Sequence, residues 1–368
     1  MNCVELVSSH CRLLAPYKPG LTTEKIKQQY EIEDVYKYAS NESPFPPSPL
    51  AIEAMQQALA ESNRYPDYDK LKGAIANQFN LHVSQIILGT GSINVLELIF
   101  QIFNLPGNNV VFSSHSYFAY PLLATKTGLK INTAASDNNF AHVAENLVAQ
   151  CDDQTSLLVI DNPTNFAGTA LNGEQIKWIL SQVSKKTIVV LDQAYAEFAD
   201  IPFVDISPEL FERYPNLIIT RTFSKAYSLA SMRIGYGLAH PEVISWLDRQ
   251  QQPFPISHVA NQGAIASLQD TAYSENTINS IKAGRKWLNE QLNTLGISTS
   301  DSHSNFVLGH FGANANALYQ DLLENGFITR QMSAYNAPEY IRISIGTALE
   351  NERLIEAITA RQTLWSEV

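Results

Sequence analysis

The sequence is poor in cysteine, in basic residues and in long apolar runs, and each shortage excludes a class of protein. Its 368 residues include three cysteines, Cys3, Cys11 and Cys151, and no CxxC pair. An odd count without such a pair argues against a disulfide framework or a zinc site, and it fits a reducing compartment. We therefore expect no metal centre and a cytoplasmic location.

Basic residues are too few for a protein that binds nucleic acid. The chain has 25 lysines and arginines against 36 acidic residues, which gives a formal net charge of −11. Nucleic-acid binding needs a basic stripe to neutralise phosphates, so we expect no nucleic-acid partner. If the substrate is an anion, the site must supply its own local arginines.

The chain also lacks an apolar segment that could cross a bilayer, so we expect no membrane partner. The longest apolar runs, among them Leu157–Ile160 and Ile188–Leu191, have the length of buried strands. The first residues, Met1–Leu6, contain no basic region followed by a long apolar core, and we predict no signal peptide. Hydrophobic residues make up 45% of the chain, which is enough to bury the cores of two domains.

Short apolar runs alternate with helical patterns through the middle of the chain, which is typical of an α/β fold. The runs are Ile86–Leu88, Val110–Ser113, Leu129–Thr133, Leu157–Ile160, Ile188–Leu191 and Leu217–Thr220. Because they are continuous rather than alternating, they predict strands that are covered on both faces. We expect a mostly parallel sheet of the seven-stranded type, sandwiched by helices, with ligands bound at the carboxyl ends of the strands.

Turn-rich and proline-rich segments mark the expected domain boundaries. The link Asn41–Pro47 follows an N-terminal arm, and Pro253–Pro255 breaks the chain before a long helical stretch from about His258. Phe306–Leu308 and Ile341–Ile345 then predict strands of a second, smaller α+β domain. The expected parts are an arm that packs with the small domain (1–40), a large domain (41–252) and a small C-terminal domain (253–368).

Four motifs follow predicted strands in chain order, and each has an ordinary structural interpretation beside a chemical one. Gly89–Ser92 opens a helix predicted to run to about Leu105, and its backbone N–H groups could hold a phosphate. The alternative is a tight turn with an ordinary N-cap. Asn165, in the loop Asn162–Gly168, could donate to a phenolate oxygen, or it could simply belong to a turn.

The other two motifs place charged side chains after buried strands. Asp192 follows the run Ile188–Val190, where a buried carboxylate requires a cationic partner such as a protonated pyridine. A solvated aspartate that caps the next helix is the alternative. Lys225 lies in Thr222–Ala226, eight residues before Arg233, and could be desolvated and nucleophilic. Alternatively its amine extends into water, as lone lysines usually do.

From about Leu13 to Thr347, the chain resembles the fold-type I pyridoxal-phosphate aminotransferases, and among them it is most similar to histidinol-phosphate aminotransferase. Thr222–Tyr236 (Thr-Phe-Ser-Lys-Ala-Tyr-Ser-Leu-Ala-Ser-Met-Arg-Ile-Gly-Tyr) matches the family's lysine segment closely. The resemblance implies that the cofactor is pyridoxal 5′-phosphate and that Lys225 binds it covalently and moves a proton. It also implies that Asp192 pairs with the ring nitrogen and Tyr195 with the ring's 3-oxygen.

The resemblance further implies which residues hold the cofactor and the substrate. The remaining cofactor-binding positions are Tyr65, Gly91, Ser92, Tyr117, Asn165, Thr222, Ser224 and Arg233. Of these, Tyr117 would stack on the ring, and Tyr65 would reach the phosphate of a neighbouring subunit, which implies a homodimer. The substrate-binding positions are Tyr17, Asn41, Arg330 and Arg342.

Three of the substrate-binding positions would recognise anions. Arg342 would bind the substrate carboxylate, and Tyr17 and Arg330 would bind its phosphate. The ordinary alternatives are a cross-strand ion pair for Arg342, a surface position for Tyr17 and a solvated Arg330.

Three departures from the family pattern concern the substrate. Gln193 replaces the glutamate of Asp-Glu-Ala-Tyr, which removes a negative charge expected beside the cofactor. The loop ends in Asn165–Gly168 (Asn-Phe-Ala-Gly) rather than Asn-Pro-Thr-Gly. Ile93 and Asn94 stand where acidic residues often follow the phosphate turn. None of these changes removes a catalytic group, and together they suggest a specialised paralogue.

The expected activity is amino-group transfer between an amino acid or amino-alcohol phosphate, such as histidinol phosphate, and a 2-oxo acid such as 2-oxoglutarate. A decarboxylase of the threonine-phosphate type is one alternative, because it shares the lysine, the aspartate and the arginines. Which bond at the substrate Cα breaks depends on the substrate's pose. A non-catalytic cofactor-binding module is the other alternative, although no basic helix-turn-helix pattern precedes Asn41.

Overall fold

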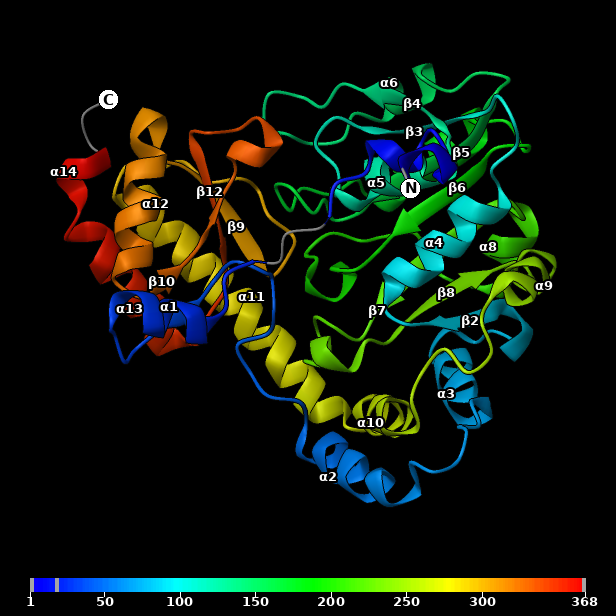
Figure 1. The fold of residues 1–368 in the computed structure, drawn as a ribbon, viewed down its shortest axis with the longest axis horizontal. Helices are drawn as coiled ribbons and strands as arrows, with labels where there is room; N and C mark the ends of the chain where they lie inside the picture. Colours follow the sequence, from blue (N-terminus) through cyan, green and yellow to red (C-terminus); the bar gives the residue numbers. More distant parts are fainter. Residues whose placement is uncertain (1–2, 17–19, 366–368) are drawn as a thin grey trace.

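The computed structural model describes residues 3–16 and 20–365, and its largest feature is a seven-stranded sheet (Figure 1). The strand order is β2-β8-β7-β6-β5-β3-β4, and only β8 runs antiparallel to its neighbours. The strands are β2 (Ile86–Gly89), β3 (Asn109–Ser113), β4 (Lys130–Ala134), β5 (Thr155–Asp161), β6 (Ile188–Asp192), β7 (Leu217–Thr222) and β8 (Gly235–Ala239). We call this sheet and the helices on its faces the large unit.

Helices cover both faces of the sheet, which explains why its strands are apolar at consecutive positions. Along β5, Leu157 and Val159 pack with α4 (Ser92–Ile102), α5 (Ala119–Thr127) and α9 (Pro241–Gln250). Leu158 and Ile160 point the other way, into a core shared with α3 (Asp69–Phe79), α7 (Gly173–Gln182) and α10 (His258–Gln269). Alternate side chains of one strand therefore fill two cores, and the predicted α/β sandwich is confirmed.

The smaller unit is built on a three-stranded antiparallel sheet, β11-β12-β9. Its strands are β9 (Phe306–His310), β11 (Arg330–Gln331) and β12 (Tyr340–Ser344), and its helices are α11 (Thr271–Thr294), α12 (Ala315–Glu324) and α13 (Ala348–Thr359). A two-stranded parallel sheet joins β1 (Tyr36–Lys37) to β10 (Phe327–Ile328). The core of this unit includes Tyr195 and Phe198, which come from the large unit.

Five further α-helices lie in the described part of the chain. They are α1 (Thr23–Tyr30), α2 (Pro49–Ala58), α6 (Ala144–Ala149), α8 (Pro208–Arg213) and α14 (Gln362–Trp365). No helix in the described part of the chain has the length and apolarity needed to span a membrane.

The N-terminal segment contacts both units (Figure 1). Its short helix η2 (Cys11–Leu13) contacts α5 of the large unit, whereas α1 packs on α12 and β1 pairs with β10 of the small unit. The division into an arm (1–40) that packs with the small domain, a large domain (41–252) and a small domain (253–368) stays a prediction.

Some predicted elements differ in extent. The helix after Gly91 ends at Ile102 rather than near Leu105, and Ser92 is its first residue rather than its N-cap. The helical stretch from His258 is two helices, because Asp270 separates α10 from α11 and its side chain accepts a hydrogen bond from the backbone N–H of Tyr273.

One strand, β8, was missed because glycines interrupt its apolar pattern. Gly235 pairs with Gly89 at the edge of β2, and a Cβ at Gly235 would lie 2.2 Å from the backbone nitrogen of Ser92. Only glycine fits there, since any side chain would push the start of α4 away from the sheet. The close approach places Ser92 beside the strand that follows Arg233.

Candidate functional site

A cavity of about 410 Å³ opens at the carboxyl ends of the central strands. It brings together most of the residues predicted from the sequence. Twelve of them line it: Asn41, Ser92, Tyr117, Asn165, Asp192, Tyr195, Thr222, Ser224, Lys225, Arg233, Arg330 and Arg342. Among the described residues, no group of three or more histidine, cysteine, aspartate or glutamate side chains could hold a metal ion.

Asp192 ends β6 with a buried carboxylate. It is 4% exposed, and it accepts hydrogen bonds from the Tyr120 hydroxyl at 3.1 Å and the Thr220 hydroxyl at 3.0 Å. Burial, together with the charge of Asp161, raises the pKa of Asp192 to about 6. No basic side chain in the described ranges forms an ion pair with it. A cation in the cavity would therefore stabilise this carboxylate.

The Tyr195 hydroxyl accepts hydrogen bonds from two amide groups. Asn41 Nδ2 donates at 3.1 Å and Asn165 Nδ2 at 2.8 Å. Asn41 is itself fixed by Ser344, whose hydroxyl accepts from the Asn41 backbone N–H at 2.9 Å. Burial raises the pKa of Tyr195, so the phenol stays protonated. Because its acceptor positions are used, the Tyr195 O–H can donate to an oxygen of a ligand in the cavity.

Lys225 lies just after β7 with its amine inside the cavity. Its Nζ donates to the carbonyl oxygen of Ser40 at 3.1 Å and lies 5.8 Å from the centre of the Tyr195 ring. Burial lowers the pKa of Lys225 to about 8; nearby arginines lower it further, and Glu42 opposes the shift. A larger share of neutral amine than in an ordinary lysine makes Lys225 a competent nucleophile.

Hydroxyl groups and a guanidinium gather at the start of α4. Gly91 has a φ of 77°, and a Cβ there would lie 2.5 Å from Nη2 of Arg233, so the guanidinium rests directly on the turn. Arg233 Nη1 donates to the Ala230 carbonyl at 3.0 Å and to the Ser224 hydroxyl at 3.4 Å. The Thr222 hydroxyl donates to Ser224 at 3.0 Å. This arrangement of a helix N-terminus, a guanidinium and hydroxyls can hold a phosphate.

Two arginines form one wall of the cavity. Arg330 in β11 and Arg342 in β12 are cross-strand partners. Arg342 is 6% exposed, and its Nη1 donates to the Asn165 carbonyl at 2.6 Å, while its Nε has no hydrogen-bond partner within residues 3–16 and 20–365. Neither arginine pairs with an acidic side chain in the described part of the chain. The cross-strand ion pair considered for Arg342 is therefore wrong, because its partner is another arginine.

One predicted residue, Tyr65, lies away from this site. Tyr65 is 79% exposed, does not line the cavity and stacks on Phe254 with ring centroids 4.2 Å apart. Tyr65 does not contact the cavity of its own chain, and its exposed side chain can contact a neighbouring subunit. Tyr17 lies outside the described residues.

The structure also shows a buried pair that we did not predict. Asp161, at the end of β5, lies opposite Asp192 in the parallel register, and its Oδ1 lies 3.0 Å from Nε2 of His142. An aspartate after an apolar run is the same signal that identified Asp192, and it could have identified Asp161. His142 gives no such signal, since it stands in a loop 19 residues earlier.

Gln193 does not face the cavity, which corrects the expectation that it changes the charge there. Its Oε1 accepts hydrogen bonds from Nε and Nη2 of Arg221 at 3.2 and 2.9 Å, and Glu197 accepts from Nη1 at 3.2 Å. Gln193 therefore acts on Arg221 as a neutral hydrogen-bond acceptor, and Glu197 is the carboxylate that pairs with this arginine. The residues that line the cavity are not changed by it.

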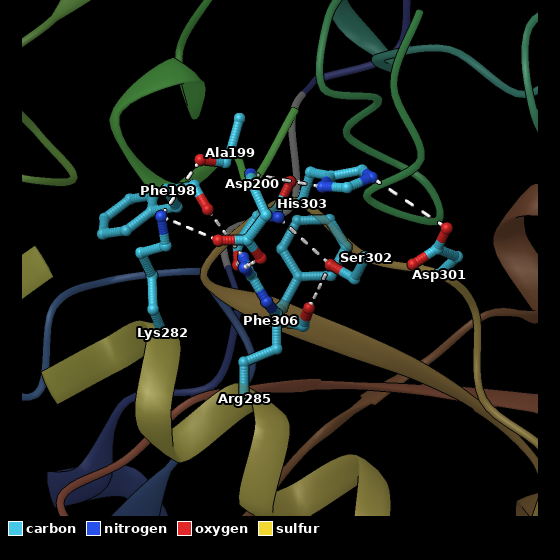
Figure 2. Close-up of polar contacts among 10 residues, drawn as sticks. Phe198, Ala199, Asp200, Lys282, Arg285, Asp301, Ser302, His303 and Phe306 are labelled. Atoms are coloured by element: carbon cyan, nitrogen blue, oxygen red, sulfur yellow. Dashed lines mark hydrogen bonds and ion pairs between the residues drawn. The ribbon is translucent and has the colours of Figure 1, made fainter. Parts of the chain in front are cut away.

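An ion cluster holds the segment that follows Tyr195 (Figure 2). Asp200 pairs with Arg285 of α11, and Arg285, which is 3% exposed, also donates to the carbonyl oxygens of Phe198 and Ser304. Phe198 belongs to η5 (Ala196–Phe198), directly after Tyr195, and Ser304 precedes β9 of the small unit. A single buried guanidinium thus joins the two units beside the cavity.

Comparison with known proteins shows the family. A model of the class I and II aminotransferases matches residues 33–358. The histidinol-phosphate aminotransferase 2 of Nitrosospira multiformis is 34% identical over 97% of this chain and 92% of its own length. The structure of histidinol-phosphate aminotransferase from Sinorhizobium meliloti in complex with pyridoxal-5′-phosphate matches with a TM-score of 0.87 and 26% identity, over 98% of each chain.

A decarboxylase shares the fold as well. The L-threonine-O-3-phosphate decarboxylase from Porphyromonas gingivalis matches with a TM-score of 0.78 over 89% of this chain and 99% of its own. Its identity is 20%, so this likeness concerns the fold alone.

We predict that Asp192→Asn stabilises the ligand-free protein at alkaline pH. The pKa of Asp192 is about 6 in the folded protein, above its value in the unfolded chain. The buried negative charge therefore destabilises the folded protein, and this effect is complete once the pH exceeds about 6. This cost disappears as the pH falls below the unfolded value. The unpaired buried donor of asparagine offsets part of the roughly 3 kcal/mol that removal of the charge would contribute, so we expect a net gain of roughly 1–2 kcal/mol at about pH 8. At about pH 4 only the unpaired donor remains, and we expect a loss of roughly 1–2 kcal/mol. Urea unfolding at both pH values measures the difference, and a less stable variant at the higher pH would contradict it.

Proposed function

Since this chain belongs to the class I and II aminotransferase family, we propose that it moves an amino group from histidinol phosphate, or a close analogue, to 2-oxoglutarate. The enzyme depends on pyridoxal 5′-phosphate, as the family and the solved relative indicate. The observation that carries the substrate proposal is the pair Arg330 and Arg342. These arginines lie in the wall of one cavity and pair with no carboxylate among the described residues.

The polar groups of the cavity fit this cofactor. Asp192 is a buried carboxylate that needs a cation, and a protonated ring nitrogen would supply it. Ser92 and Arg233 would hold the phosphate at the start of α4, and the Tyr195 O–H would meet the ring's 3-oxygen. The amine of Lys225 would bind the aldehyde carbon. When bound, the cofactor supplies an electron sink that weakens the bonds to the substrate Cα.

The residues of the chain would position the substrate and move its proton. With its amine free, Lys225 is a base whose pKa of about 8 suits it to hold and return the proton of the substrate Cα. Asn41 and Asn165 fix the Tyr195 hydroxyl from two sides, so the phenol keeps its orientation during the reaction. Arg342 would bind a carboxylate through its Nε, whose hydrogen has no acceptor among the residues that the structure describes.

Arg330 extends the recognition to a second anionic group. It lies beside Arg342 in the sheet, so the two guanidinium groups can bind two anions of one ligand. A phosphorylated donor would use Arg330, and 2-oxoglutarate would use both arginines in the other half of the reaction. The formal net charge of −11 makes these local cations necessary for attracting anions.

The decarboxylase alternative has less support. The curated relatives carry aminotransferase names, whereas the decarboxylase shares the fold at 20% identity. Measuring carbon dioxide release beside 2-oxoglutarate consumption, with L-threonine O-3-phosphate as donor because it carries a carboxylate as well as a phosphate, decides between the two reactions. Carbon dioxide release without consumption of the oxo acid would overturn the proposal.

We predict that Lys225→Ala loses the absorbance of covalently bound cofactor and all turnover, because no other amine lines the described cavity. Borohydride reduction and peptide mapping of the wild type should place the cofactor on Lys225. Lys126→Ala is the matched control, since Lys126 pairs with Glu97 on the surface. Cofactor fixed to another lysine would contradict the assignment.

The proposed homodimer, which we expect to work in the cytoplasm, can be tested through Tyr65. We predict that Tyr65→Phe weakens cofactor binding about tenfold, as expected for one hydrogen bond to a charged group. A hybrid of Tyr65→Phe and Lys225→Ala chains should nevertheless contain one site of wild-type affinity. That site would combine Lys225 of one chain with Tyr65 of the other. A hybrid whose Lys225-bearing site keeps the Tyr65→Phe defect would show that Tyr65 serves its own chain.

We predict that Arg330→Ala raises the KM for histidinol phosphate about 30-fold but changes the KM for phenylalanine less than about fivefold. A desolvated phosphate contact contributes roughly 2 kcal/mol or more, and an exposed charge contributes under about 1 kcal/mol. Steady-state kinetics with both donors measures the split. The control is Arg353→Ala, an exposed arginine that lies over the Tyr36 ring. Equally small changes in KM for both donors would show that Arg330 does not bind an anionic group of the substrate.

A further inference from the structure

Asp161 and His142 form a buried pair to which the proposed reaction assigns no role. Their side chains are 3% and 1% exposed. Asp161 Oδ1 lies 3.0 Å from Nε2 of His142, and its Oδ2 accepts the backbone N–H of Asn165 at 2.6 Å. One carboxylate thus holds both a histidine and the loop residue whose amide binds the Tyr195 hydroxyl.

The hydrogen bonds favour the neutral form of His142. Its Nε2 faces Asp161, and its Nδ1 is buried with no hydrogen-bond partner in the described part of the chain. A proton on Nδ1 would bury an unpaired, charged N–H group, which is costly. The neutral ring donates from Nε2, so it holds Asp161 in place without cancelling its negative charge.

Asp161 and Asp192 therefore form a pair of neighbouring buried carboxylates. They end adjacent parallel strands, β5 and β6, in register. In the described part of the chain, the groups that hydrogen-bond to them are uncharged: the hydroxyls of Tyr120 and Thr220 on Asp192, and the backbone N–H of Asn165 and the ring of His142 on Asp161. Burial lowers the pKa of the nearby His115, so that ring does not supply a cation.

Two like charges in a buried site destabilise each other, and one cation placed beside them relieves both. Asp161 and Asp192 both line the cavity, so a cation bound there can lie beside both carboxylates. With the ring nitrogen at Asp192, the charge of Asp161 adds to the field that retains the proton on that nitrogen.

We propose that Asp161, held by His142, is a positioning residue of this active site. Its charge acts alongside Asp192 to keep the cofactor's ring nitrogen protonated, and its second oxygen fixes the loop that carries Asn165. The inference rests on the cofactor placement proposed above. It assigns to the chain a second carboxylate that controls the strength of the electron sink.

The test follows the protonation of the ring nitrogen in the holoenzyme. Asp161→Asn keeps an acceptor for the Asn165 N–H and a polar partner for His142, and it removes the charge. In cofactor labelled at the ring nitrogen, the NMR chemical shift of that atom reports its proton as the pH is raised. We expect the variant to lose this proton about one pH unit earlier than the wild type, a tenfold change in the protonation equilibrium.

Matched variants separate the charge from packing. His142→Gln offers Asp161 an amide donor and keeps the carboxylate, so its ring nitrogen should titrate like the wild type. Asp161→Ser also removes the charge and replaces Asp161→Asn if that variant binds no cofactor. An unchanged titration in the charge-removing variant overturns the inference, since a purely structural residue would not move the proton equilibrium.

Asp192→Asn distinguishes this failure from a failure of the proposed cofactor placement. If the ring nitrogen sits at Asp192, this variant loses the proton across the whole pH range. A ring nitrogen that stays protonated in Asp192→Asn would show that the cofactor placement is wrong. The proposed role of Asp161 would then be wrong as well.

Discussion

The constraint on which the rest of the site depends is the burial of the Asp192 carboxylate at the end of β6. Two hydroxyl groups satisfy its oxygens, but hydroxyls cannot balance its charge, and its pKa rises to about 6. The folded chain thus contains a strained electrostatic site that binding of a cation relieves. Because a charge in a poorly solvated place acts more strongly than one in water, the same burial that destabilises the free protein gives the ligand its binding energy.

Holding the groups around Asp192 in place requires both units of the molecule. Tyr195 follows β6 of the large unit, but its ring packs in the core of the small unit. Its hydroxyl accepts hydrogen bonds from Asn41 and Asn165. Arg285 joins the turn after Tyr195 to the approach of β9 (Figure 2). The cavity therefore exists only where the two cores meet, so its geometry depends on how the units are packed together.

The sequence predicted those features of the fold and the site that depend on one strand and the residues immediately around it. Continuous apolar runs predicted six of the seven strands, and charged residues that follow those runs, Asp192 and Lys225, were candidate site residues that do line the cavity. The resemblance added residues that no local pattern marks, such as Asn41 and Arg342. The partners of these residues could not be predicted, since they depend on contacts between distant segments: His142 meets Asp161, and Gln193 turns toward Arg221. The glycines of β8 hid a strand because they serve a close approach to Ser92 rather than the apolar pattern.

The altered loop shows how a departure from the family pattern can act on the substrate wall. Phe166 is fully buried, and its ring contacts Tyr335, with centroids 5.6 Å apart, and Phe140 at 4.8 Å. Tyr335 lines the same cavity as Arg330 and follows β11 closely in the chain. Phe166 thus links the loop of Asn165 to the wall that carries the anion-binding arginines. A proline there could not fill this space, so the departure changes the support of the substrate wall and leaves the groups around Asp192 intact.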